Sequence, residues 1–174
     1  MAIVSRWLVA AACMLPVMFP AHAVEVSRTD LQGASGMCKA ALPGYAAAAR
    51  YRPLGLNNES SDHIFVSCNW QGDDSQFGVR GARRVFVVVG NHAAVARTVS
   101  CTLVNGFQQG SNLQATYTVK SLNVPAGAGV SFEWLPADVP GAPETIKLPS
   151  VSCALPPQSS LQYTGKVYNE DVGA

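Results

Sequence analysis

Side chains able to do acid–base or nucleophilic chemistry are few in this chain and widely spaced. Of the three histidines, only His63 and His92 lie outside the N-terminal apolar segment. His63 opens an alternating stretch and His92 follows Asn91 in a turn, which predicts exposed or structural imidazoles. The sequence has no H-E-x-x-H and no G-x-S-x-G motif, so it predicts neither a zinc peptidase nor a serine hydrolase of the α/β type.

Acidic residues could serve a glycosidase, which needs two carboxylates about 5 to 10 Å apart across the sugar bond. Glu133 has the outward parity of its strand, and the other acids lie in turns or near the C-terminus. Because sequence spacing brings no two of them together, we interpret them as turn and surface charges. A small carboxylate-dependent glycoside hydrolase is the alternative function. The acids considered are Asp62, Asp73, Asp74, Glu133, Glu170 and Asp171.

Aromatic rings could instead bind a ligand without catalysis, because a flat apolar ring face can pack on the C–H face of a sugar. Tyr168 has the parity of the polar residues on its strand, which predicts an outward ring, and Phe65 is a second candidate. Trp70 and Trp134 have apolar parity, and we expect both in the core.

Turns are the other expected place for a binding site, since loops on a rigid scaffold commonly carry binding residues. The relevant stretches are 57–62 and 71–75. The run Gly72-Asp73-Asp74-Ser75 offers oxygens to a calcium ion but lacks the spacing of an EF-hand, so we interpret it as a turn. No metal and no cofactor are predicted. The predicted ligand-binding residues are Tyr168, Asn58, Asp73 and Asp74.

The cysteines indicate two disulfides. Cys13 lies in the N-terminal apolar segment, which leaves Cys38, Cys68, Cys101 and Cys153, an even number without the paired C-x2-C spacing of a structural zinc site. Three connectivities are possible. We favour Cys38 with Cys68 and Cys101 with Cys153, because the last two share a V-S-C-x-L setting that points both sulfurs inward from adjacent or facing strands.

Short alternating stretches with almost no helix predict the architecture. Strands are expected at 54–56, 63–70, 84–89, 98–103, 113–121, 130–134, 145–148 with 151–155, and 161–168, with turn residues between them. We expect 84–89 and 98–103 to form a hairpin, with the second strand ending at Asn105-Gly106. The fold class is therefore all-β: one antiparallel β-sandwich of jelly-roll type, stapled by two disulfides.

Inward parity assigns a core to this sandwich. The expected core residues are Ile64, Val66, Val85, Val87, Val99, Leu103, Tyr117, Val119, Phe132, Trp134, Val151, Leu155, Tyr163 and Val167.

The N-terminus predicts export. Arg6, an apolar run from Trp7 to Phe19 and the small residues of Ala21-His22-Ala23 are typical of a cleavable signal peptide over residues 1–23, with one domain over 24–174. Lipidation at Cys13 is a weaker alternative. The apolar run is too short to span a bilayer. Only Arg6 of the 12 basic residues, and none of the 11 acidic ones, lies in this segment, so the remainder is neutral. We therefore expect no nucleic-acid partner and no membrane span.

Several stretches together resemble uncharacterised small exported two-disulfide β-sandwich proteins of Gram-negative bacteria. They are Leu56-Asn57-Asn58 before a strand ending in Cys68, Val85 to Asn91 followed by Val99-Ser100-Cys101-Thr102-Leu103, Ser152 to Pro157, and Tyr168-Asn169-Glu170-Asp171. The resemblance covers roughly 38–173, implies a bacterial host and a β-sandwich, and brings no catalytic residues. The strand pattern also looks like jelly rolls of the galactose-binding kind. The sequence thus predicts a secreted or periplasmic, non-catalytic protein that binds a glycan or a protein partner.

Overall fold

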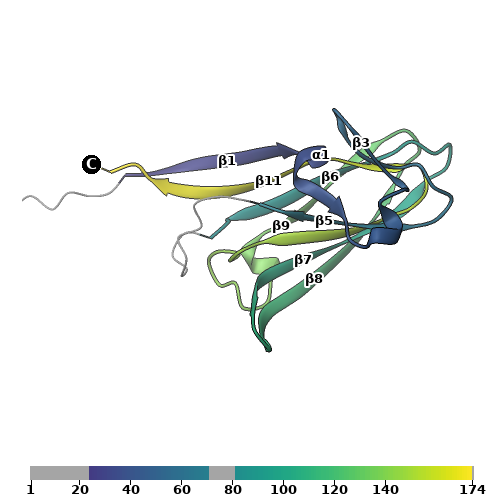
Figure 1. Cartoon of the computed structure of the whole chain (residues 1–174). Helices are drawn as coiled ribbons and strands as arrows, with labels where there is room; N and C mark the ends of the chain where they lie inside the picture. Colours follow the sequence, from purple (N-terminus) through teal and green to yellow (C-terminus); the bar gives the residue numbers. More distant parts are fainter. Residues whose placement is uncertain (1–23, 71–80, 174) are drawn as a thin grey trace, which may run out of the picture.

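Two antiparallel sheets form the body of the protein (Figure 1). The computed structural model describes residues 24–70 and 81–173, so the predicted signal peptide and the whole stretch 71–75 lie outside the described residues. One sheet has the order β3 (Ala49–Arg52), β4 (Gly55–Asn58), β11 (Ser159–Asp171), β6 (Arg84–Asn91), β9 (Gly129–Trp134), with β1 (Glu25–Gly33) also paired to β11. The other has the order β2 (Cys38–Ala40), β5 (Ile64–Asn69), β10 (Ser150–Leu155), β7 (Arg97–Gln109), β8 (Asn112–Val124).

The strand order is that of a jelly roll. Counted one to eight from β4, the central strands of the two sheets run 1-8-3-6 and 2-7-4-5, and the pairings are antiparallel. This order is the double Greek key of jelly rolls, and it confirms the predicted fold class. The structure adds short elements before and between the strands: α1 (Ala34–Met37), η1 (Pro43–Tyr45) and η2 (Pro136–Asp138).

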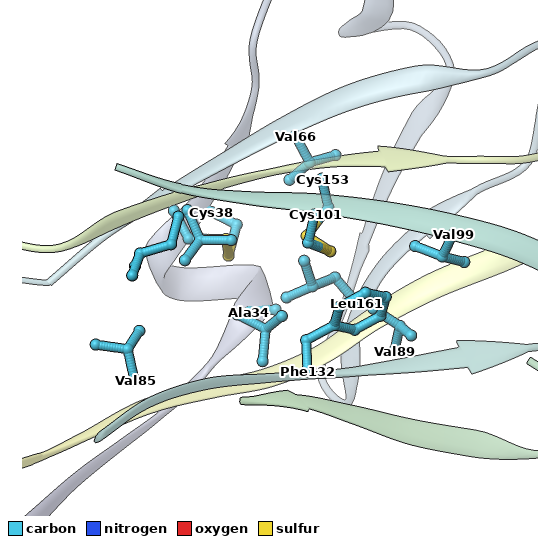
Figure 2. Packing of buried hydrophobic residues seen from close by; sticks show 14 of the residues in the cluster. Ala34, Cys38, Val66, Val85, Val89, Val99, Cys101, Phe132, Cys153 and Leu161 are labelled. Carbon is cyan, nitrogen blue, oxygen red and sulfur yellow. A yellow bond between two sulfur atoms is a disulfide. The ribbon is translucent and has the colours of Figure 1, made fainter. Parts of the chain in front are cut away.

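The core lies between the two sheets. Figure 2 shows Val66, Val99, Cys101 and Cys153 of one sheet above Val85, Val89 and Phe132 of the other, with Ala34 of α1 between the layers. Trp134 and Phe132 are fully buried, as their parity predicts, and Trp70 packs partly buried against the same cluster. Burial of this continuous apolar layer is the main force holding the sheets together.

Both predicted disulfides are present, and both staple neighbouring strands of the five-stranded sheet. Cys38 joins Cys68 across β2 and β5, and Cys101 joins Cys153 across β7 and β10. In each case the two cysteines are direct partners in the strand register. The V-S-C pattern therefore turns its cysteines inward, as expected, and turns its serines to the outer face.

The predicted hairpin between 84–89 and 98–103 is wrong. β6 lies in the six-stranded sheet and β7 in the other, because the short connection after Asn91 crosses from sheet to sheet. The hairpin partner of β7 is β8. Nor does β7 end at Asn105-Gly106: Gly106 has a φ of 118°, which bends the strand without ending it, and its N–H donates to Lys147 O at 2.9 Å.

Three expected core residues, Tyr117, Val119 and Tyr163, are exposed. On β8 the partners of Tyr117 and Val119 are Val104 and Thr102, which have the outward parity of β7. On β11 the register to β6 shifts between Leu161 and Tyr163. This bulge inverts the alternation, so Leu161 is buried and Tyr163 is not. Val167 is only partly buried for the same reason.

The ends of β1 and β11 extend beyond the body as a two-stranded ribbon (Figure 1). β1 pairs with β11 from Glu25 to Gly33, whereas the pairing of β6 with β11 ends at Val167. Val24 N–H donates to Gly173 O at 3.2 Å, and Val172 N–H donates to Val24 O at 3.0 Å. Within the described residues, no helix has the length and apolarity to cross a membrane.

Candidate functional site

The structure does not bring Asn58 and Tyr168 together. Asn57, next to Asn58, pairs with Ser160 near the start of β11, eight residues before Tyr168. At about 3.3 Å per residue this separation is roughly 26 Å. Asp73 and Asp74 lie outside the described residues. The predicted ligand-binding residues that the structure describes therefore belong to two different regions of the sandwich.

Tyr168 lies on the same face of its strand as Thr164 and Lys166, as the sequence predicts, but in the structure this is the inner face and not the outer one. Thr164 and Lys166 are both buried. The bulge before Tyr163 turns this face toward the opposite sheet rather than toward solvent. Tyr168 itself lies past the end of β6, is half-buried, and has Lys166 Nζ 5.5 Å from its ring centroid.

Asn58 holds its own loop together. Its Nδ2 donates to the main-chain oxygens of Asp62 at 2.7 Å and Leu155 at 2.8 Å. Its Oδ1 accepts from the N–H of Ser60 at 3.0 Å and from Ser60 Oγ at 2.7 Å. The side chain is 1% exposed, so its hydrogen-bonding capacity is used inside the protein.

A histidine and a serine lie close enough to form an activated nucleophile, but the serine is shielded from solvent. His92 Nε2 lies 2.9 Å from Ser160 Oγ, which is hydrogen-bonding distance. Ser160 is only 2% exposed, so a substrate carbonyl has no path to its hydroxyl. Among the described residues no carboxylate contacts His92, and so no third group orients the imidazole. His63 is exposed at the start of β5.

Several carboxylates of the described strands and of the loops beside them pair with cations. Glu133, on the outward face of β9 as predicted, lies 3.8 Å from Arg84, and Glu170 lies 2.7 Å from Arg28. A glycosidase acid needs a raised pKa. The pKa of Asp138 is instead lowered, by the hydrogen bond from the Leu135 backbone first and by Lys120 second. Arg50 and Arg52 also pair with Glu59, and Lys120 pairs with Asp138.

Aromatic residues gather at the outer margin of the five-stranded sheet, beside β2. Phe65 on β5 is 46% exposed, and its ring centroid lies 6.1 Å from that of Tyr45 in η1. Tyr51 on β3 is also exposed, and its hydroxyl accepts a hydrogen bond from Ala40 N–H at 3.2 Å. The Tyr51 hydroxyl thereby satisfies the backbone N–H of Ala40 at the free edge of β2. Phe65 was expected from its outward parity.

Two hollows flank β2 at this margin. One, of about 420 Å³, is lined by Ser35, Cys38, Lys39, Ala40, Ala41, Leu42, Pro43, Ala46 and Tyr51. The other, of about 340 Å³, is lined by Met37, Lys39, Ala40, Ala41, Ser67 and Asn69. Lys39 lies between them and has no ion-pair partner among the described residues. We call Lys39, Tyr45, Tyr51, Phe65, Ser67 and Asn69 the β2-edge site; it combines three rings with an ammonium, a hydroxyl and an amide.

Sequence reasoning proposed only Phe65 of the β2-edge site and missed Lys39, Tyr45, Tyr51, Ser67 and Asn69 as site residues. The available signal was the isolated tyrosines, each placed beside a proline or glycine turn among small or charged residues. Tyr51 is exposed, whereas Tyr45 packs partly buried against the core cluster.

A third hollow lies where the sequence analysis expected a loop site. It has about 370 Å³ and is lined by Asn57, Asn58, Glu59, His92, Gln158 and Ser159. Gln158 has a φ of 60°, a conformation that non-glycine residues rarely adopt. The lining is polar and has no Phe, Tyr or Trp ring. Among the residues at 24–70 and 81–173, no group of three His, Cys, Asp or Glu side chains could hold a metal ion.

No protein-family model matches the sequence, and no curated protein is significantly similar to it. Among solved structures, the chain is similar to a family 11 carbohydrate-binding module from Clostridium thermocellum in complex with a β-1,3-1,4-mixed-linked tetrasaccharide. That match has a TM-score of 0.37 and 8% identity, and it covers 83% of this chain and 86% of the other. The chain is also similar to TmCBM61 in complex with β-1,4-galactotriose, with a TM-score of 0.28, 11% identity and coverage of 82% and 88%. At these low scores the likeness carries no argument about the ligand of this chain.

Proposed function

We propose that this chain is an exported, non-catalytic carbohydrate-binding protein and that its ligand binds at the β2-edge site. The observation that carries the proposal is the exposed ring of Phe65, packed against Tyr45 beside polar groups that face solvent. Rings placed next to hydroxyl, amide and ammonium groups suit a sugar, which has apolar C–H faces and hydroxyl edges. The two disulfides, together with the signal peptide that the sequence predicts over residues 1–23, support an oxidising, exported setting.

A binding role also agrees with the surroundings of the reactive side chains. Ser160 is buried, and the carboxylates of Glu133 and Glu170 are paired with arginines. None of them has the arrangement of an acid beside a second carboxylate that glycoside hydrolysis needs. The hydrolase alternative therefore has no observation among the described residues in its favour.

A glycan array on the full chain, exported by a bacterial host and purified, tests the proposal. Mass spectrometry of the product should place the mature N-terminus at Val24. We expect binding to at least one neutral or charged glycan, lost in Phe65→Ala and weakened in Tyr51→Ala. Tyr163→Ala is the matched control, because Tyr163 is an exposed ring on the outer face of the other sheet.

Three results would contradict the proposal. Turnover of a glycoside that is abolished by Glu133→Ala or Asp73→Ala would make the protein a hydrolase. Array binding that is lost in Tyr168→Ala but kept in Phe65→Ala would place the site on β11 instead. Absence of any glycan binding by the folded protein would reject the carbohydrate class.

A further inference from the structure

The outer face of the five-stranded sheet carries a second exposed ring, far from the β2-edge site but on the same face as Phe65. Tyr117 on β8 is 56% exposed. Its register partner is Val104 on β7, and Val104 is the partner of Ser150 on β10, which in turn pairs with Asn69 on β5. Because partners in register point to the same face, Tyr117 and Asn69 share the face of Phe65, four residues before Asn69.

Between the two rings the same face is lined by hydroxyl groups. Ser152 of β10 has Ser67 as its register partner on one side and Thr102 on the other. Ser67 Oγ and Ser152 Oγ are 3.4 Å apart. Ser100 and Ser121, one step along the strands, are joined Oγ to Oγ at 2.6 Å. The repeated V-S-C pattern thus contributes Ser67, Ser100 and Ser152 to one surface, with all three partly exposed.

Phe65, Ser152, Thr102 and Tyr117 follow one diagonal across the sheet. β5 and β8 are separated by β10 and β7, so three strand spacings of about 4.8 Å separate the two rings sideways, and about four residues separate them along the strands. The diagonal is roughly 20 Å long. This length exceeds a single sugar ring and suits several linked units.

The outer face of the five-stranded sheet is polar but almost uncharged. Apart from Lys39 at its margin, its side chains are uncharged: Phe65, Ser67, Asn69, Ser150, Ser152, Ala154, Ser100, Thr102, Val104, Tyr117, Val119 and Ser121. Protein interfaces centre on buried aromatic and apolar anchors and are poor in serine. A hydroxyl-lined surface with a ring at each end suits a sugar chain better than a protein.

We propose that the ligand is the interior of a neutral, linear glycan chain that runs across β5, β10, β7 and β8 from Phe65 to Tyr117. The inference rests on the proposed function and deepens it: it makes the β2-edge site one end of a track rather than a pocket for a terminal sugar. The hydroxyls of Ser152 and Thr102 hydrogen-bond the middle units, and the two rings pack on the outer ones.

The test compares ligands of different length and uses variants that block the middle of the track, which we define as Phe65, Ser152, Thr102 and Tyr117. Oligosaccharides of neutral β-linked glucan and mannan, from disaccharide to hexasaccharide, are titrated calorimetrically against the purified full chain. We expect the affinity to rise about tenfold between the shortest and the longest bound member, because a second aromatic contact adds roughly that factor. Ser152→Trp and Tyr117→Ala should each remove this gain in affinity with length.

Ser131→Trp is the matched control, since Ser131 pairs with Val88 on the outward face of β9 in the other sheet. It should bind every length as the unmodified protein does. Circular dichroism and thermal unfolding show that the variants are folded. Equal affinity for all lengths, an unaffected length gain in Ser152→Trp, or preference for an anionic glycan would overturn the track while the proposed function stood. Absence of binding to any glycan would reject the proposed function itself.

Discussion

Cys38 and Cys68 lie directly opposite each other on β2 and β5, with their Cα atoms 4.1 Å apart. β2 is only three residues long and is an edge strand. It carries Lys39 between the two hollows of the β2-edge site. The disulfide therefore fixes the strand on which the candidate site depends, whereas Cys101–Cys153 joins strands inside the sheet.

Replacing Cys38 and Cys68 together by alanine should loosen β2 and lower the free energy of unfolding by about 3.5 kcal/mol, from the entropy of the opened loop. The matched Cys101→Ala, Cys153→Ala protein should lose about 4 kcal/mol. Urea unfolding measures both losses. Amide hydrogen exchange should speed up at Lys39 in the first protein only. Equal protection of Lys39 in both would contradict the local role of Cys38–Cys68.

Asn58→Ala should destabilise the protein by about 2 kcal/mol, because it leaves buried backbone partners such as the Leu155 carbonyl without a donor. The melting temperature should fall by about 6 °C. Asn57→Ala is the control, since Asn57 lies beside it and makes no side-chain hydrogen bond to the described residues. If Asn58→Ala keeps its melting temperature and loses glycan binding, Asn58 is a ligand residue, as the sequence suggested.

Gly106→Ala should destabilise the protein by at least about 2 kcal/mol more than Gly110→Ala. Both glycines have positive φ, so a side chain strains the backbone at either position. Only at Gly106 would the new Cβ approach a backbone atom, Gln114 O, at 2.0 Å, while Gly110 has open space around it. Thermal unfolding of the two variants compares them directly. Similar losses would show that β7 and β8 separate easily at this point.

The lowered pKa of Asp138 predicts a small acid-dependent loss of stability. The folded pKa lies below the ordinary value of about 3.9, so the contribution is complete above that value and is lost as the pH falls through the folded pKa. The side chain is well exposed, so the effect should stay below about 1 kcal/mol. An NMR titration should find the Asp138 pKa raised in Lys120→Met, though still lowered by the Leu135 N–H. An unchanged pKa would contradict the role of Lys120.

Alternation within single strands was enough to determine much of this protein. It predicts the sandwich, the inward cysteines of the V-S-C pattern, the burial of Trp134 and the exposure of Phe65 and Glu133. These features follow from the two-residue period of a strand and from the hydrophobic effect on single side chains, and both act locally in the sequence. The shared setting of Cys101 and Cys153 also favoured, among three possible connectivities, the pairing that the structure confirms.

Only the tertiary structure decided which strands are neighbours and where the alternation breaks. The short connection after Asn91 crosses between sheets, and nothing local distinguishes it from a hairpin. The bulge before Tyr163 reverses the parity of β11. Tyr168 therefore shares the inner face with buried Lys166, although the polar residues on its parity predict an outward ring. The β2-edge site joins Tyr45, Tyr51 and Phe65 from three separate segments, and their proximity depends on strand pairing and a disulfide, which are long-range interactions that a local period does not encode.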